Sequence, residues 1–312
     1  MPASYVHQSI ALAALKKLGD SLTAAEQSAW LSGCEGPDPF FFSFFRPGRA
    51  NYLPFIGTRL HRTCTDTFLL TLCTGANTPV LRAYCYGFLS HYAADTVFHP
   101  YIHGHSLTKE GAYSSNLHGI LEHQYEIIRF LEDNGEGYPV QMAGIAALTD
   151  ADKRQIAAHL TACIHAVFPE FVLSESKMVR TFNDSVLVCR LLRSEDGKKY
   201  STLGRFPLNL DKIAHAHMVP CEPPDFDITN RAHAPWFSIF EPERERHESL
   251  DDLYETAVRQ SCLYIEAARC LHAGELSGES FMKILGGLSY DSGLPWETTP
   301  PPHLAPGCRH HK

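Results

Sequence analysis

The chain has 312 residues, of which 44% are hydrophobic, and its formal net charge at pH 7 is −8. Such a length and composition are typical of a globular protein with a buried core, in one large domain or two of ordinary size. Apart from the terminal RHHK there is no run of Lys and Arg. A nucleic-acid groove built on general electrostatics is therefore not indicated, and nucleic acid is not the favoured partner.

The N-terminal sequence MPASYVHQSIALAALKKLGD lacks the basic stretch and the continuous apolar run of a signal peptide. No segment approaches the roughly 18 unbroken apolar residues of a transmembrane helix. We therefore expect a soluble, cytoplasmic protein. The ten cysteines include no CxxC pair, and we expect them to be reduced thiols in mostly buried positions.

The first predicted element is an amphipathic helix from Tyr5 to Leu18, because apolar residues recur there at intervals of three and four, and Gly19 is placed to end it. His7 lies in its first turn. On spacing alone we expect that histidine to lie on the surface. A short helix is predicted over residues 24–31.

The segment GCEGPDPFFFSFF follows, with Asp38 between two prolines. Pro37 and Pro39 exclude Asp38 from a helix interior and hold it on a stiff loop, which suits a carboxylate to metal binding or catalysis. Five phenylalanines come next, and we expect them either to be core residues or, if exposed beside a site, to contact an apolar ligand. They are Phe40, Phe41, Phe42, Phe44 and Phe45.

The remaining pattern predicts an all-α fold, because period-two alternation is scarce. Helices are predicted over residues 57–72, 79–99, 116–132, 152–167, 174–193, 249–271 and 277–285, with Asn116 as a cap. Residues 101–115 and 218–242 are predicted connections. Asp196-Gly197 could turn a short hairpin, although a helix followed by a loop is preferred. We expect one helical domain over residues 1–289 and a Pro-rich, flexible tail over residues 290–312.

The most informative stretch runs from Ala83 to Glu126 and holds six histidines. His91, Asp95 and His99 recur every four residues, so a helix of about 3.6 residues per turn places them along one stripe. His118 and Glu122 repeat the interval on a second helix. Each such group buried without a partner would cost roughly 1 to 3 kcal/mol. We therefore interpret the stretch as metal-binding rather than as core packing.

The candidate ligands are all nitrogen or oxygen donors without a thiolate, which favours zinc in a catalytic role. They are His7, Asp38, His61, His91, Asp95, His99, His118 and Glu122. This set exceeds the needs of one ion. A di-iron bundle is less consistent with the pattern, since its ligands come as Glu-x-x-His at three-residue spacing.

The motifs GPDPF, GTRLH, GFLSHYAADTVFHPY and HGILE resemble the bacterial zinc-dependent phospholipase C family, which is related in fold to the fungal single-strand-specific nucleases. The likeness covers roughly residues 5–130, with a weaker echo at HAPW and the helix after it. It implies a multi-helix bundle around a metal cleft that holds three zinc ions.

The resemblance also implies a ligand set for each ion. Asp38, His61, His91 and Asp95 would hold one ion, Asp95 would bridge to a second that His7 also binds, and His99, His118 and Glu122 would hold the third. The spacing from Asp95 to His99 differs from that of the secreted enzymes, so His103 or His105 are alternatives to His99. The secreted enzymes also bind the bridged pair through a processed N-terminal residue, whereas six residues precede His7 here. What completes the shell at His7 stays open.

The implied activity is hydrolysis of a phospholipid, or another phosphodiester, on the glycerol side of its phosphate. Two or three zinc ions would make the site positive inside an acidic protein, which suits an anionic phosphodiester. Asp38 is the candidate for orienting or deprotonating the attacking water. A transient contact with a membrane surface would follow from a lipid substrate. The alternatives are a nuclease or nucleotidase on the same scaffold, with aromatic side chains to clamp a base, and a metal-binding protein without turnover.

Overall fold

A computed structural model describes residues 4–43, 52–193 and 226–309 of the chain. In these ranges the protein is all-α, as the sequence predicts. The sheet found there is a two-stranded antiparallel pair, β1 (Trp236–Phe237) and β2 (Glu245–Arg246), with Trp236 opposite Arg246. None of the helices within these ranges is both long enough and apolar enough to cross a bilayer.

The described ranges contain the following helices in chain order. They are α1 (Ser4–Leu18), α2 (Ala24–Gly33), the 3₁₀ helix η1 (Asp38–Ser43), α3 (Leu53–Arg62), α4 (Thr65–Thr74), α5 (Pro79–Gly104), α6 (Ser115–Asn134), α7 (Ala143–Ala147), α8 (Asp150–Val167), α9 (Glu175–Leu192), α12 (Leu250–His272), α13 (Gly278–Leu285), and the 3₁₀ turns η2 (Trp296–Thr298) and η3 (Pro302–Leu304).

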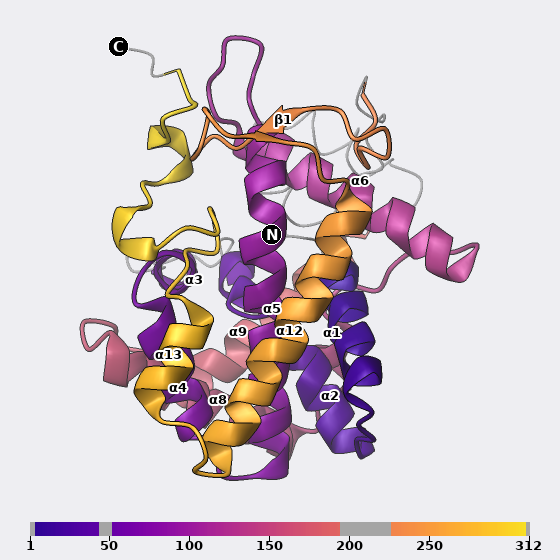
Figure 1. Ribbon diagram of the computed structural model, residues 1–312. Helices are drawn as coiled ribbons and strands as arrows, with labels where there is room; N and C mark the ends of the chain where they lie inside the picture. The colour runs from indigo at the N-terminus through magenta and orange to yellow at the C-terminus, as the bar shows by residue number, and fades with distance from the viewer. Residues whose placement is uncertain (1–3, 44–51, 194–225, 310–312) are drawn as a thin grey trace.

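The helix α5 forms the axis of the fold, and α12 and α2 pack most extensively against it (Figure 1). It is buried on nearly all sides, as expected of a helix that is apolar all round. Two glycines bring α2 and α5 into backbone contact, because a Cβ at Gly33 would clash with the carbonyl of Tyr84 and a Cβ at Gly87 would clash with that of Trp30. This close approach fixes the end of α2 beside the middle of α5.

Three predicted helix boundaries are corrected by local geometry. The range 57–72 is two helices, α3 and α4, because Cys64 between them adopts a left-handed backbone with φ of 52°. The helix α5 continues past Pro100, which removes only one amide from a helix that tertiary packing encloses. Ser114, and not Asn116, caps α6: its side chain accepts a hydrogen bond from the amide of Leu117.

The Pro-rich segment from residue 290 is not a flexible tail over the range that the structure describes. Tyr290 is fully buried in the main core, and Ala305 and Cys308 form a small cluster with Ile239 and Phe240. The prolines form turns and 3₁₀ helices here, and the burial of apolar side chains offsets the cost of ordering them. The prediction of a mobile tail is therefore wrong for residues 290–309.

Two other sequence predictions concern residues outside the described ranges in whole or in part. The hairpin alternative at Asp196-Gly197 lies outside them, and so do Phe44 and Phe45. Among the described cysteines all nine are free and most are buried, whereas Cys221 falls beyond the described ranges.

Candidate metal centre

The eight predicted ligands come from five elements and meet in the interior. The helix α1 supplies His7, the start of η1 supplies Asp38, α3 supplies His61, α5 supplies His91, Asp95 and His99, and α6 supplies His118 and Glu122. None of these side chains belongs to a residue more than 5% exposed. The expectation of a surface position for His7 was wrong, since that residue is 1% exposed.

Asp95 lies at the centre of the group, and its two oxygens face different histidines. Oδ2 is 3.1 Å from Nε2 of His91 and 3.5 Å from Nε2 of His61, whereas Oδ1 is 3.4 Å from Nε2 of His7. Two ligand atoms on one tetrahedral zinc ion are about 3.3 Å apart, given the usual zinc–ligand distances. These spacings would fit a cation at each oxygen of Asp95, and Oδ1 also lies 3.8 Å from Nε2 of His99.

Three of the histidines are oriented by backbone carbonyls. Nδ1 of His61 lies 2.8 Å from the carbonyl oxygen of Gly57, Nδ1 of His91 lies 3.0 Å from that of Cys34, and Nδ1 of His99 lies 2.8 Å from that of Tyr290. A carbonyl oxygen can only accept, so each Nδ1 carries the proton and donates it. Each Nε2 then faces the centre, where the neutral imidazole directs its lone pair, which is the arrangement of metal-binding histidines.

The inward-facing atoms are the clearest sign that the group is built for cations. Nε2 of His61, His91 and His99 and both oxygens of Asp95 are buried without a hydrogen-bond partner among the described residues. Buried polar atoms are rarely left in this way, because each costs free energy. The donor set of imidazole nitrogens and carboxylate oxygens fits zinc.

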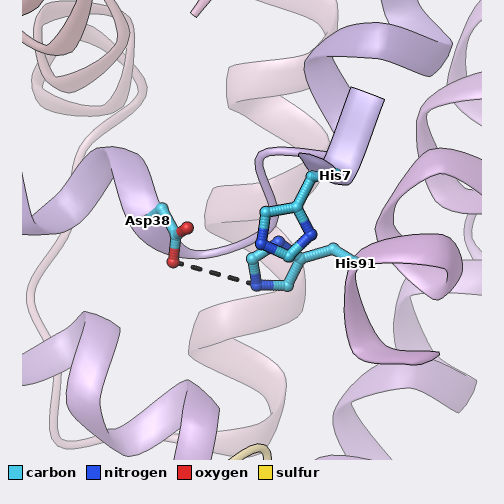
Figure 2. Close-up of side chains that lie close together, drawn as sticks. All are labelled: His7, Asp38 and His91. Carbon is cyan, nitrogen blue, oxygen red and sulfur yellow. Dashed lines mark ion pairs between the residues drawn. The ribbon is translucent and has the colours of Figure 1, made fainter. Parts of the chain in front are cut away.

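Asp38 reaches the same place from the loop after α2. Its Oδ1 is 3.3 Å from Nε2 of His61 and 3.8 Å from Nε2 of His91, and Figure 2 shows it directed at His91, over which the ring of His7 is stacked at 4.1 Å. Gly36 makes this approach possible, because it has φ of +50° and a Cβ there would clash with the imidazole of His91. The loop GCEGPDP is thus shaped around α5, the helix that carries His91, Asp95 and His99 and is called the ligand helix below.

The third group lies farther along α5. Glu122 Oε1 is 2.8 Å from Nε2 of His118 and 3.3 Å from Nε2 of His99. Of the three histidines that the sequence left open, His99 is the one that faces Glu122. His103 lies beside this group, with its ring 4.6 Å from that of His118. Nδ1 of His105 instead donates a hydrogen bond to the carbonyl of Tyr101, and its ring stacks on that of Phe226.

Burial and mutual contact set the protonation states. Burial opposes ionisation of Asp95, but the imidazoles of His91 and His99 hold the pKa of Asp95 well below its usual range. Burial, with His91 beside it, holds the pKa of His7 well below its usual value. Burial lowers the pKa of His61 and His91, but the carboxylates of Asp38 and Asp95 outweigh it and raise the pKa of His61 to about 10 and that of His91 above its usual value. A metal ion binds the ionised carboxylate and the neutral imidazole, so its binding would release protons from these two histidines.

Two residues near the centre were missed by sequence reasoning. The ring of Tyr290 lies 5.1 Å from that of His61, and Asp291 Oδ1 lies 3.8 Å from Nε2 of His103. They sit in the Pro-rich C-terminal segment, where neither periodicity nor ligand spacing marks them. Of the three phenylalanines of the run 40–45 that the structure describes, Phe40 and Phe42 are buried and Phe41 is partly exposed. The ring of Phe41 lies 5.4 Å from that of His61.

Comparison with protein-family models matches residues 6–175 to the family described as zinc dependent phospholipase C. The match covers more than half of the chain and includes all eight predicted ligands, whereas Tyr290 and Asp291 lie beyond it. No curated protein and no solved structure matches the chain.

Proposed function

The chain belongs to the zinc-dependent phospholipase C family, and on this basis we propose that it is a zinc-dependent phosphoric diester hydrolase that cleaves a phospholipid on the glycerol side of phosphate. The observation that carries the proposal is the ring of buried nitrogen and oxygen atoms that point inward without hydrogen-bond partners. Such a ring suits a cluster of cations, and a cluster of cations suits an anionic phosphodiester.

We propose two or three zinc ions with the following ligands. Asp38, His61, His91 and Asp95 bind the first, Asp95 and His7 bind the second, and His99, His118 and Glu122 bind the third. The split of Asp95, with Oδ2 toward His61 and His91 and Oδ1 toward His7, supports the bridging role. Bound zinc would lower the pKa of a coordinated water towards roughly 7 and polarise the phosphoryl oxygens.

The residues of the chain have separate tasks in this proposal. Asp38 orients the attacking water and takes its proton. Asp38 approaches the imidazoles through Oδ1, so we assign Oδ2 as the atom that accepts the proton of the attacking water. The carbonyls of Gly57 and Cys34 hold His61 and His91 in place. Because these partners are fixed by helices, the ligands are positioned before substrate arrives.

The surface of α3 supports a transient contact with lipid. Phe55 is 57% exposed and Val172 is 81% exposed. They belong to one patch, because the ring of Phe171 lies 5.9 Å from that of Phe55 and 6.4 Å from that of Tyr52, and the hydroxyl of Tyr52 donates to the carbonyl of Val172. The same helix carries His61. We propose that this patch, formed by Tyr52, Phe55 and Val172 over the buried ring of Phe171, touches the membrane surface while a phospholipid is bound.

We also propose that the domain continues beyond the predicted end at residue 289. Tyr290 belongs to the same core as α1, α5 and α12, and its backbone forms hydrogen bonds with the carbonyl of His61 and with Nδ1 of His99. A helical domain of this kind would reach at least to Arg309.

Hydrolysis of short-chain phospholipids tests the proposal directly. The zinc-loaded protein should release diacylglycerol and a phosphorylated head group, and a chelator should abolish the release. A panel of head groups defines the specificity. Faster hydrolysis of single-stranded nucleic acid or of nucleotides would favour the nuclease alternative, and zinc binding without hydrolysis of any phosphate ester would leave a metal-binding protein.

A further inference from the structure

The turn after α13 is attached directly to two of the proposed ligands. The amide of Tyr290 donates to the carbonyl of His61 at 2.9 Å, and the carbonyl of Tyr290 accepts from Nδ1 of His99 at 2.8 Å. One residue of the C-terminal segment therefore joins α3 to α5 at the metal centre. The next residue along the chain is Asp291.

The shape of this turn is fixed by Gly293. Its amide donates to the carbonyl of Ser289 at 2.9 Å, its φ is +65°, and a Cβ there would clash with the carbonyl of Thr96 on α5. Pro100 lacks the amide that would otherwise donate to Thr96 in the helix. The turn consequently lies against the backbone of the ligand helix, and Asp291 is held at its inner side.

Asp291 and His103 face each other beside His99. Asp291 is 7% exposed, and its Oδ1 lies 3.8 Å from Nε2 of His103. His103 is 2% exposed, and neither of its ring nitrogens has a hydrogen-bond partner among the described residues. Ligand atoms of His99, His103 and Asp291 all lie within 4.8 Å of one another. Arg62 pairs with the other oxygen of Asp291 through Nε.

His99 belongs to two possible ligand groups, and this limits what they can do. One group is His99 with His118 and Glu122, and the other is His99 with His103 and Asp291. Nδ1 of His99 is occupied by Tyr290, so only Nε2 can bind metal. A single lone pair binds one ion, so an ion on Nε2 of His99 would lie next to ligand atoms of both groups.

We propose that Asp291 and His103 are further ligands of the zinc ion bound by His99. The inference rests on the proposed function, since it places two residues in the shell of that centre. Asp291 lies outside the stretch matched to the family, so this shell would extend the ligand set with a residue from the far end of the chain.

Substitution of Asp291 by cysteine gives a direct readout that does not depend on activity. Cobalt(II) bound to a thiolate shows an intense ligand-to-metal charge-transfer band. We expect the band in the cobalt-loaded full-length Asp291→Cys variant and not in the cobalt-loaded wild type. A loaded Asp291→Cys variant without the band would overturn the proposal.

Zinc binding gives the second readout. At a buffered free zinc concentration, Asp291→Asn and His103→Gln should each lower the affinity for the zinc ion bound by His99 at least tenfold, the usual effect of losing a residue around a metal site. The double variant Asp291→Asn/His118→Gln should lose the same single equivalent as His118→Gln, because both residues serve one ion. Loss of a further equivalent in the double variant would contradict the shared ion.

Two controls separate ligation from structural effects. Glu297→Gln removes an exposed charge from the same segment and should bind zinc like the wild type. Arg62→Gln removes the ion pair but leaves the carboxylate, so zinc binding should be retained. A zinc loss in Arg62→Gln equal to that in Asp291→Asn would show that Asp291 acts only as the partner of Arg62.

The proposal and the function on which it rests fail in different ways. If Asp95→Asn loses zinc while Asp291→Asn and His103→Gln bind it normally, the further ligands are wrong and the centre stands. If the wild type binds no zinc, both are overturned.

Discussion

His99 donates its Nδ1 proton to the backbone carbonyl of Tyr290, 191 positions farther along the chain. The bond fixes which nitrogen of His99 faces Glu122, and it anchors the C-terminal turn on the ligand helix. Order in the turn and geometry at the metal centre therefore depend on each other. Because the bond is made by a backbone atom, substitution of the tyrosine side chain alone would not remove the acceptor.

We expect His91→Ala and Asp95→Asn to lose zinc and to melt at a lower temperature than the wild type. Asp95 is fully buried among the imidazoles of His7, His61 and His91, and removing one partner from a buried charged group costs on the order of 3 to 5 kcal/mol. Elemental analysis and thermal unfolding measure the two effects. Glu136→Gln, at an exposed position, is the control. Unchanged zinc content and melting temperature in both variants would show that His91 and Asp95 do not bind the metal.

Asp38→Asn should lower the turnover of a phosphodiester substrate by on the order of 10² or more, the scale of a general base. Much of the zinc should remain, because His61, His91 and Asp95 come from helices that hold an ion without the loop. Turnover and zinc content are measured on the same preparation, with Asp150→Asn at an exposed position as the control. Near-normal turnover with full zinc would mean that Asp38 is neither base nor essential ligand.

Glu35 should make the zinc-free protein less stable as pH rises from about 4.5 to about 7. Burial raises the pKa of Glu35 to about 7, against the hydrogen bonds from Ser4 and Gln8, from an ordinary value of 4.5. Between these values the unfolded chain has released the proton and the folded protein still holds it, so folding loses free energy as pH increases. Above about 7 both states are ionised, and the full cost of the buried charge applies.

The Glu35→Gln variant tests this effect, because it removes the ionisation and keeps the size of the side chain. Its gain in unfolding free energy over the wild type should be largest at pH 8, up to about 3 kcal/mol, and should shrink towards pH 4.5. Denaturant unfolding across this range measures the difference, with Glu136→Gln as the control. Zinc is removed first, since bound cations would favour the ionised carboxylate. A difference that does not vary with pH would show that Glu35 does not titrate in this window.

The double variant Phe55→Ser/Val172→Ser should hydrolyse phospholipid in vesicles several-fold more slowly, while its turnover of a soluble short-chain substrate stays near that of the wild type. Both side chains are more than half exposed, so their loss removes lipid contact and little packing. Val140→Ser/Leu263→Ser, which changes two other exposed apolar residues, is the matched control. Equal losses on both substrates would indicate damage to the fold instead of to a lipid contact.

The helices and the residues that share a helix face could be predicted from the sequence, because they depend on residue spacing over a few helical turns. Four-residue spacing placed His91, Asp95 and His99 on one face of a helix, and the structure confirms an all-α fold with α5 as its axis. The prolines around Asp38 indicated a stiff loop, and that residue begins the 3₁₀ helix η1.

Contacts between distant segments were decided only by tertiary structure. His7 was expected on the surface from spacing and is buried, and which of His99, His103 and His105 faces Glu122 depended on where α6 lies. Asp291 gave no local signal, since its place beside His103 depends on the turn that Gly293 fits against Thr96. Periodicity specifies which side chains share a helix face, whereas the atoms that meet across the core are selected by the packing of whole elements.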